Sequence, residues 1–377
     1  MTEVITLKGF IERRKATRIP LSVPARYRFE DESPRWNPAR TVDFSQLGVR
    51  LVTSDLIAIG RSVEVEMELP DVSGPFCVRG RVVWNRPSSS SPQTECGISF
   101  INLKELTRKE KINSFLADKL CHLALRHPSD LVARPALSYA DYEVAYHLVY
   151  EQYLERGYCR SNSPRQHYHY HCVFPDSRTF LLEKKEQLLG TISLIPDSPG
   201  GLPLESIFPE EIANLRKTGR RLAEVVLLAV DLSQLGARRF TLTDFFKLTC
   251  VFCLFKIVFD YSRNVGVTDL VITMHPKHEE LYRYLNFETI GPIKTYSTAC
   301  GKPAIPMHLD ISRAERSSAR NRGVGSFFLR ESFSREMLEK NHVWTAQEVR
   351  EMLVSKQLLW PEIPWQVRNY IAQCYSL

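Results

Sequence analysis

Two different hydrophobic patterns divide the chain, and this division limits its possible folds more than any other feature. In the N-terminal third, short segments alternate apolar and polar residues and are separated by turn residues. The five segments are residues 24–29, 48–53, 62–69, 76–85 and 95–101. Strands this short and closely spaced predict a small antiparallel β-barrel or sandwich, followed by a helix at about 107–127.

The middle of the chain alternates helical and strand patterns instead. Helical patterns cover residues 139–156, 209–219, 244–263 and 277–285. Strand patterns cover residues 179–183, 188–196, 221–230 and 268–274, and the third of these is almost continuously apolar, as in a buried strand. This order of helices and strands predicts an α/β domain.

The residues from Ser312 onward differ from both preceding parts. Residues 313–326 are dominated by Arg and Ser and predict an exposed linker, and helices are expected at 331–340, 346–356 and 364–376. We therefore predict a multidomain α+β protein. Its parts are a barrel at 8–120, an α/β domain at 133–311 and a linker with helical extension at 312–377. The extension is expected to cap the site of the α/β domain, dock the barrel or form a homodimer.

Composition excludes several classes of protein. Of the 377 residues, 44% are apolar and 25% are charged, which is ordinary globular usage and excludes a largely disordered chain. No apolar run reaches the roughly 18 residues of a membrane span, and the N-terminal residues show no signal-peptide pattern. Nine cysteines, an odd number, are a poor disulfide framework, so a reducing cytoplasm is expected. The net charge of +7 favours anionic ligands or partners.

A basic run and a short polar motif lie near the start of the barrel. Paired arginines in a flexible arm can fork onto phosphates or onto the O6/N7 edge of guanine. An Asp and a Ser at a strand entry can complement guanine N–H groups or phosphate oxygens, and a glycine leaves room for close backbone approach. The residues concerned are Arg13, Arg14, Arg18, Asp43, Ser45 and Gly48. By itself, such a basic run is more often a solvated tail.

The combination of RxxxR and DxSxxG ahead of a small barrel is more specific. With Trp84 and the closing stretch 95–100, it resembles the PilZ domain over about residues 8–120. The resemblance implies binding of the bacterial second messenger c-di-GMP. Arg14 and Arg18 would hold phosphate and guanine, and the Asp-Ser-Gly motif would line the base pocket. Arg13 would accompany an intercalated dinucleotide dimer. The alternative is a degenerate PilZ barrel that binds nothing.

A single carboxylate interrupts the apolar strand at 221–230. Glu224 lies among aliphatic residues, where a carboxylate is costly unless it is paired or functional. It either pairs with Arg220 or Arg221, faces an edge of the sheet, or has a raised pKa and accepts a proton from an attacking amine.

A spread-out pattern around Glu224 extends this interpretation. It comprises residues 190–197, 201–204, 208–209, 215–216, 219–225, 275–278, 282, 285–288, 291–292 and 301–304. The pattern resembles the long-chain N-acyl amino acid synthases, a GNAT-fold branch related to the acyl-homoserine lactone synthases, over about residues 135–311. The resemblance implies that an amino-acid α-amine attacks an acyl thioester, usually on acyl carrier protein, without a catalytic cofactor.

The same resemblance implies roles for particular residues. Glu224 would deprotonate the amine directly or through water, and a backbone N–H near Val225 or Val226 would stabilise the oxyanion. Phenylalanines of the long helix either line an acyl tunnel or form ordinary helix core, and the latter is favoured. They are Phe245, Phe246, Phe252, Phe255 and Phe259.

Two departures from related enzymes affect the donor and the product. Residues 231–242 lack the glycine-rich turn that cradles the coenzyme A pyrophosphate. The turn instead carries Arg238 and Arg239, which suit the acidic surface of a carrier protein but are also compatible with a solvated turn. Tyr146 falls where lactone synthases carry an arginine, and this difference counts against a lactone as the product.

Two further clusters are interpreted as structural. His167, His169 and His171 would share one face of a strand and could hold a metal, but no further ligand is evident, so a polar loop or strand entry is expected and no metal. Cys250 and Cys253 lie in the apolar helix pattern and are expected to be buried.

The sequence therefore predicts a cytoplasmic, c-di-GMP-responsive N-acyltransferase. Its expected reaction transfers a long acyl chain from acyl carrier protein to an amino acid. The alternatives are a non-catalytic c-di-GMP effector that binds a lipid or protein, and an enzyme similar to acyl-homoserine lactone synthases.

Overall fold

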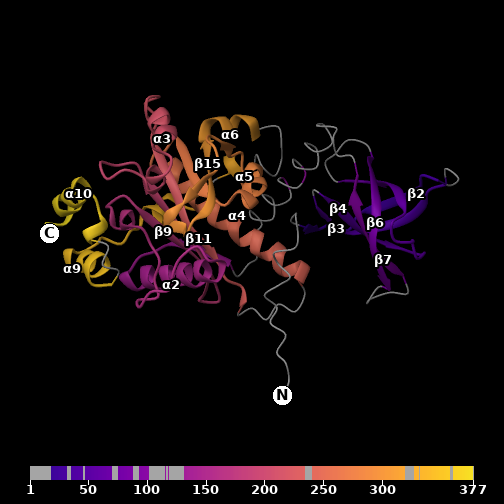
Figure 1. Cartoon of the computed structure of the whole chain (residues 1–377), viewed down its shortest axis with the longest axis horizontal. Coiled ribbons are helices and arrows are strands. Elements are labelled where there is room, and N and C mark those ends of the chain that lie inside the picture. The colour runs from indigo at the N-terminus through magenta and orange to yellow at the C-terminus, as the bar shows by residue number, and fades with distance from the viewer. Residues whose placement is uncertain are drawn as a thin grey trace, which may run out of the picture. The chain divides into compact units, whose positions relative to one another are not determined.

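The computed structural model describes most of the chain as two compact units (Figure 1). The first contains the N-terminal barrel and the second a mixed sheet with helices. The described residues are 18–31, 35–45, 47–69, 75–87, 93–101, 115, 118, 131–233, 240–318, 327–330, 332–356 and 360–376.

The first unit is a closed antiparallel barrel, as predicted. Six strands pair in the order β3-β2-β5-β6-β7-β4, and pairing of β4 with β3 closes the barrel, while β1 adds to β3. The strands are β1 (Arg18–Pro20), β2 (Pro24–Phe29), β3 (Asn37–Ser45), β4 (Gly48–Thr53), β5 (Ser62–Met67), β6 (Phe76–Pro87) and β7 (Thr94–Phe100). Alternate residues such as Tyr27, Val49 and Ile98 point inward and are fully buried, which explains the period-2 pattern.

The sequence missed β3 because its pattern is broken. The pairing register of β3 with β4 shifts between Thr41 and Asp43, so the strand buries Thr41, Asp43, Phe44 and Ser45 rather than alternate residues. The helix predicted at 107–127 falls outside the described residues, apart from Phe115 and Asp118.

The second unit is built on a sheet with the strand order β13-β15-β12-β11-β10-β9-β8, to which β14 adds at β15. Its central pair, β11 and β12, is parallel, and the other pairs are antiparallel. The strands are β8 (Leu131–Pro135), β9 (Arg178–Lys184), β10 (Gln187–Pro196), β11 (Leu222–Val230), β12 (Asp269–Met274), β13 (Glu288–Thr289), β14 (Lys294–Tyr296) and β15 (Lys302–Asp310).

Helices α2 (Tyr139–Arg156) and α4 (Phe240–Asn264) pack on opposite faces of this sheet. Phe180 of β9 contacts Tyr261 of α4 with ring centroids 5.5 Å apart, whereas the next residue, Leu181, belongs to the core that contains Tyr146 of α2. Successive strand residues point to opposite faces, so the two helices cover both. Figure 1 shows α2 below β9 and β11 in this view. Shorter helices α3 (Pro209–Arg216) and α5 (Glu279–Tyr284) precede β11 and β13.

The apolar residues of α4 form core, as favoured from the sequence. Phe252, Phe255 and Phe259 are buried, and so are both cysteines at 250 and 253. The side chain of Phe245 lies outside the described residues, and Phe246 is half-buried. Within the described residues, no helix combines the length and apolar character needed to span a membrane.

The C-terminal part continues the second unit. Its helices are α6 (Ile311–Ser318), α8 (Arg335–Glu339), α9 (Ala346–Arg350), which continues as a π-helical segment at Glu351–Lys356, and α10 (Trp365–Tyr375). The prediction of an exposed linker at 313–326 is therefore wrong for residues 313–318, which belong to α6. Helix α6 forms there because Ile311 and Ala314 are buried and ion pairs join Arg313 to Glu288 and Glu315 to Arg263.

Two sets of contacts hold the extension to the domain. On α4, the buried side chain of Lys256 binds both Asp260 and the carbonyl of Arg330. Phe327 and Phe328 pack against the same helix. On the α2 face, Trp344 packs on Tyr142 with ring centroids 4.6 Å apart. The extension thus completes the core of the second unit.

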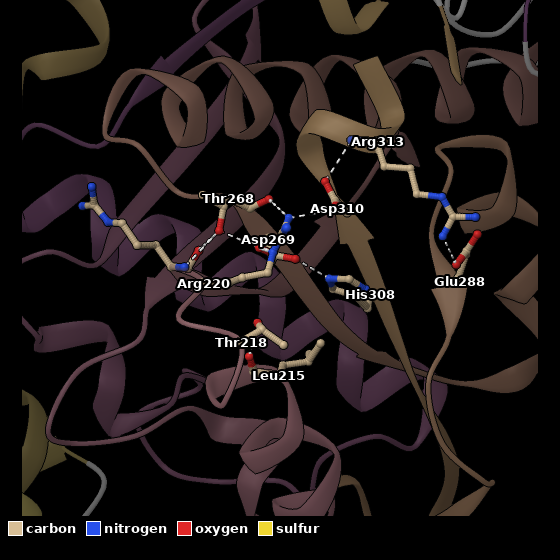
Figure 2. Close-up of polar contacts among 10 residues, drawn as sticks. Leu215, Thr218, Arg220, Thr268, Asp269, Glu288, His308, Asp310 and Arg313 are labelled. Atoms are coloured by element: carbon tan, nitrogen blue, oxygen red, sulfur yellow. Dashed lines mark hydrogen bonds and ion pairs between the residues drawn. The ribbon is translucent and has the colours of Figure 1, made fainter. Parts of the chain in front are cut away.

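A buried carboxylate ties together the starts of β11 and β12 and the end of β15 (Figure 2). Asp269 accepts hydrogen bonds from Arg220 (2.5 Å), Thr268 (2.5 Å) and the His308 ring (2.6 Å). Arg220 also pairs with Asp310 at 2.9 Å. Burial alone raises the pKa of Asp269, but the hydrogen bonds from His308, Arg220 and Thr268 outweigh it and hold the pKa below its usual value.

Candidate functional site

In the barrel, the buried carboxylate of Asp43 contacts one further predicted motif residue, Arg18. Asp43 lies between two arginines, with Arg18 Nη1 2.6 Å from one carboxylate oxygen and Arg50 Nη2 2.7 Å from the other. Strand β1 supplies Arg18, because it pairs with β3 so that Arg18 lies opposite Ser45 and Pro20 opposite Asp43. Asp43 therefore orients the guanidinium of Arg18. Arg13 and Arg14 lie outside the described residues.

Ser45 and Gly48 form the turn between β3 and β4. The Ser45 hydroxyl donates to the Gly48 carbonyl (3.1 Å) and accepts from the backbone N–H of Leu47 (3.3 Å). Gly48 is needed because a Cβ there would lie 2.3 Å from the Ile98 carbonyl oxygen of β7. The close backbone approach expected at this glycine is thus one within the barrel itself.

Arg50 is a polar member of this cluster that the sequence interpretation missed. It bridges Asp43 to Glu95 (3.3 Å), which in turn pairs with Arg86 at 3.0 Å. Little in the sequence indicated this role. Arg50 occupies one of the alternating polar positions of β4, where an ordinary solvent-facing residue is expected. Three cations and two carboxylates therefore meet at this edge of the barrel, an arrangement suited to an anionic ligand.

In the second unit, Glu224 is fully enclosed. Its carboxylate accepts a hydrogen bond from the backbone N–H of Leu204 (2.8 Å), which belongs to the 3₁₀ turn Pro203–Ser206. The sequence left open a pair with Arg220 or Arg221, but Arg220 binds Asp269 and Asp310 instead. The pKa of Glu224 is raised to about 8, chiefly by burial; the hydrogen bond from the Leu204 N–H opposes this rise, and the nearby charge of Glu205 adds a smaller increase.

Strand β11 opens away from β12 just beyond Glu224. Their ladder ends at the pair Val225–Ile272, so β11 after Val225 has no ladder partner on β12 among the described residues. On the other side, the pairing of β11 with β10 shifts between Ser193–Val226 and Thr191–Ala229, and Leu227 takes a left-handed φ of 54°. This bulge redirects backbone groups at the opening, where Val225 and Val226 lie.

One aromatic side chain lies beside Glu224, and others cluster around Tyr153 of α2. Tyr296 of β14 is close enough to Glu224 that, after burial, the carboxylate charge is the main influence raising the pKa of its phenol. Ser206 of the Leu204 turn is close enough to the same phenol to oppose this rise in its pKa. Tyr153 of α2 contacts the rings of Tyr158 (5.8 Å) and His167 (5.2 Å).

The three histidines form a row of neutral rings outside any strand. His167 and His169 lie in a loop, and His171 lies in the 3₁₀ helix Tyr170–Val173. Consecutive ring centroids lie 6.2 Å and 6.5 Å apart. Burial lowers the pKa of His167 to about 4, and burial with the neighbouring His167 lowers that of His169 to about 3. The pKa of His171 is lowered by burial as well. Each ring is therefore uncharged at neutral pH.

Not every predicted residue can be placed at a site. Arg238 and Arg239 lie outside the described residues. Within the described part of this unit, Lys277 lies 5.9 Å above the Tyr158 ring, and Lys302 approaches Gly157, so that a Cβ there would lie 3.5 Å from its ammonium. These two cations border the aromatic side chains on the α5 side.

Comparisons with known proteins agree with both halves of this description. A sequence profile described as N-acyl amino acid synthase FeeM matches residues 144–310, and the PilZ domain profile matches residues 12–118. FeeM, an N-acyl amino acid synthase from uncultured soil microbes, is 31% identical, covering 50% of this chain and 97% of that chain with a TM-score of 0.44. No match is found among curated proteins.

More distant structures match each unit separately. The AHL synthase LasI is 16% identical and covers 48% of this chain and 88% of its own, with a TM-score of 0.36. The PilZ domain of YcgR from Escherichia coli, solved with c-di-GMP, is 16% identical and covers 26% of this chain and 86% of its own, with a TM-score of 0.22.

The parallel pair that opens beside a buried glutamate, together with the profile matches, defines an N-acyltransferase domain of GNAT-like fold that follows a PilZ barrel in the sequence. By its identity to FeeM over nearly all of that chain, the chain belongs to the N-acyl amino acid synthase family. Both resemblances inferred from the sequence are therefore confirmed.

Proposed function

We propose that the protein is a cytoplasmic, c-di-GMP-responsive N-acyltransferase that moves a long acyl chain from acyl carrier protein to the α-amine of an amino acid. The observation that carries the catalytic half is Glu224, a carboxylate enclosed beside the opening of β11 with its pKa raised to about 8. A carboxylate with this pKa is matched to proton transfer near neutral pH.

In the proposed reaction, the neutral amine attacks the carbonyl carbon of the acyl thioester. A C–N bond forms, the carbonyl oxygen becomes an oxyanion, and Glu224 takes the proton that the amine nitrogen loses, directly or through water. The C–S bond then breaks, the carbonyl re-forms, and the carrier's thiolate leaves and takes up a proton. The products are an N-acyl amino acid and a free carrier thiol.

The oxyanion needs hydrogen-bond donors, and a backbone N–H near Val225 or Val226 is the proposed source. Support comes from the bulge at Leu227 and from the end of the β11–β12 ladder, which together free backbone groups at this point. Removing one such donor typically costs about 10²–10³ in rate.

The donor is proposed to be a carrier protein rather than coenzyme A. Arg238 and Arg239 remain its proposed contacts, since residues 231–242 carry no glycine-rich phosphate turn. Lys277 and Lys302 add positive charge beside the aromatic side chains, which favours an acidic partner.

Mass spectrometry of lipid extracts tests the catalytic proposal. Cells that express the wild type should contain an N-acylated amino acid that is missing from cells expressing Glu224→Gln. The glutamine side chain keeps an oxygen that accepts from the Leu204 N–H but cannot take up the proton, so the variant should fold normally. Equal lipid profiles would favour the non-catalytic effector, whereas an N-acyl-homoserine lactone would identify the lactone alternative.

The regulatory half rests on the barrel. Arg14 and Arg18 are proposed to hold phosphate and guanine of c-di-GMP, with Asp43, Ser45 and Gly48 lining the base pocket and Arg13 accompanying an intercalated dinucleotide dimer. Support comes from the Arg18–Asp43–Arg50 cluster and the match to the PilZ domain profile. Because these charge-assisted hydrogen bonds are the strong ones, Arg18→Ala should weaken binding by about 10–100-fold.

Isothermal titration with c-di-GMP tests this step. Arg26→Ala is the control, since Arg26 pairs with Glu66 on the same barrel and does not belong to the cluster. Equal binding by both variants would contradict the proposed pocket. Turnover measured with and without c-di-GMP, in the wild type and in Arg18→Ala, then tests whether the ligand controls the enzyme.

A further inference from the structure

The segment that holds Glu224 is a turn at residues 197–206, here named the glutamate turn. Its Leu204 N–H donates to Glu224 at 2.8 Å. Arg216 fastens both ends of the turn, since it binds Asp197 (2.6 Å) and Glu205 (2.6 Å), and Glu205 accepts from the N–H of Leu202 (2.7 Å). These contacts fix the turn on the side of α3.

The other side of the glutamate turn rests on Phe174. A Cβ at Gly200 would lie only 2.3 Å from Cζ of Phe174, so ring and backbone are in direct contact. Phe174 is itself fully buried, and it packs edge-on against Tyr370 of α10 with ring centroids 5.2 Å apart. The Tyr370 hydroxyl also lies close enough to Ser198 of the turn for Ser198 to oppose the rise in its pKa that burial causes.

Neighbouring contacts keep α10 in this position. Tyr375 of α10 donates to the carbonyl of Val173, and Tyr168 donates to the carbonyl of Met352 (2.6 Å) in the π-helical segment that precedes α10. Val367 and Ile371 of α10 belong to the same core as Leu202 and Leu204 of the turn. A continuous series of contacts thus runs from the half-buried Tyr370 of α10 through Phe174 and Gly200 to the turn whose N–H binds Glu224.

We infer that α10 supports the acyltransferase site and that Tyr370 is a positioning residue. Tyr370 holds the glutamate turn against Glu224 through Phe174 and Ser198. This inference rests on the proposed role of Glu224 and deepens it. Helix α10 lies outside the 144–310 segment matched by the synthase profile. The C-terminal extension therefore adds a support to the site that the matched segment alone does not supply.

The physical consequence of removing Tyr370 follows from packing. Without the ring, Phe174 loses one side of its contact and no longer fixes Gly200, so the turn opens more often. An edge-to-face aromatic pair accounts for roughly a tenfold change in such an opening equilibrium. The Leu204 N–H then spends more time away from Glu224, and fewer encounters have the base in its productive position.

Hydrogen exchange of the full-length protein, followed by mass spectrometry, tests the positioning directly. Backbone amides of residues 200–207 should exchange roughly tenfold faster in Tyr370→Ala than in the wild type. Amides of β11 should be unchanged. Trp365→Ala is the matched control, because Trp365 lies on the same helix with 61% of its surface exposed. Gly200→Ala should reproduce the faster exchange from the other side of the contact.

Steady-state kinetics provide a readout that a general loss of stability would not move. In Tyr370→Ala, kcat should fall roughly tenfold while KM for the amino acid stays within about twofold. Tyr370→Phe keeps the ring and should restore most of kcat.

Unchanged exchange at 200–207 in both Tyr370→Ala and Gly200→Ala, or equal acceleration in β11, would overturn the inference. Because exchange is measured without substrate, this result is independent of whether Glu224→Gln loses activity.

Discussion

The buried ion pair on α4 allows a quantitative test of how the C-terminal extension is held. Lys256 is fully buried, its ammonium lies 2.5 Å from Asp260, and it also binds the Arg330 carbonyl. Asp260 in turn accepts from the N–H of Ser332 at 3.0 Å. Lys256→Met removes the cation and leaves the carboxylate enclosed, which typically costs about 3–5 kcal/mol.

The cost of Lys256→Met should depend on pH. Burial already raises the pKa of Asp260, and Lys256 opposes this, so removing the lysine raises the pKa further. A group whose pKa is raised in the folded state contributes stability below its unfolded pKa and loses it as pH rises. The unfolding free energy lost in Lys256→Met should therefore be small near pH 4. The loss should grow by up to about 1.4 kcal/mol per pH unit and level off at the pKa of Asp260 in the folded variant.

Urea unfolding of the full-length variants between pH 4 and 8 measures this. Lys256→Met/Asp260→Asn removes both charges and should recover most of the loss. Arg335→Met is the control, since Arg335–Glu339 has the same i,i+4 spacing at 2.6 Å but is exposed, and it should leave the free energy of unfolding unchanged. A Lys256→Met penalty no larger than that of the control, or one independent of pH, would refute the reasoning.

Three further predictions concern the sites. Product formation should rise as pH increases through about 8, because Glu224 is the base only when ionised and its pKa is raised to about 8; a flat profile between pH 6 and 9 would contradict this. Arg50→Ala should weaken c-di-GMP binding, since Arg50 holds Asp43 at 2.7 Å, and titration calorimetry showing wild-type affinity would exclude that role. Asp269→Asn should lower the free energy of unfolding by about 2–3 kcal/mol at pH 7. Because the folded pKa of Asp269 is depressed, its contribution is present above pH 4 and lost as pH falls below, so wild type and variant should converge in acid when followed by calorimetry.

Most of the fold was predictable where apolar residues repeat regularly. Strands β2 and β4 and helix α2 have the predicted boundaries, because each buries one regular face. The pattern failed where the backbone is irregular. The bulge between Thr41 and Asp43 concealed β3, and Pro303 and Pro306 concealed β15, since proline counts against a strand.

The candidate sites were only partly predictable, for a related reason. Glu224 was recognisable as a carboxylate in an apolar strand, but its partner is the backbone N–H of Leu204, and backbone donors carry no residue signature. Tyr296 comes from a strand of three residues, too short to give a pattern. The support from Tyr370 depends on a contact between segments far apart in the sequence, which no local rule reveals.

The most direct test of the proposed mechanism is turnover by the purified protein with acyl carrier protein thioesters and a mixture of amino acids. Wild type and Glu224→Gln are compared at equal thermal stability and equal c-di-GMP binding. The account predicts an N-acyl amino acid from the wild type and a rate about 10²–10⁴-fold lower from the variant. A variant that retains turnover within about tenfold of the wild type, below the smallest loss expected for a general base, would contradict the role of Glu224.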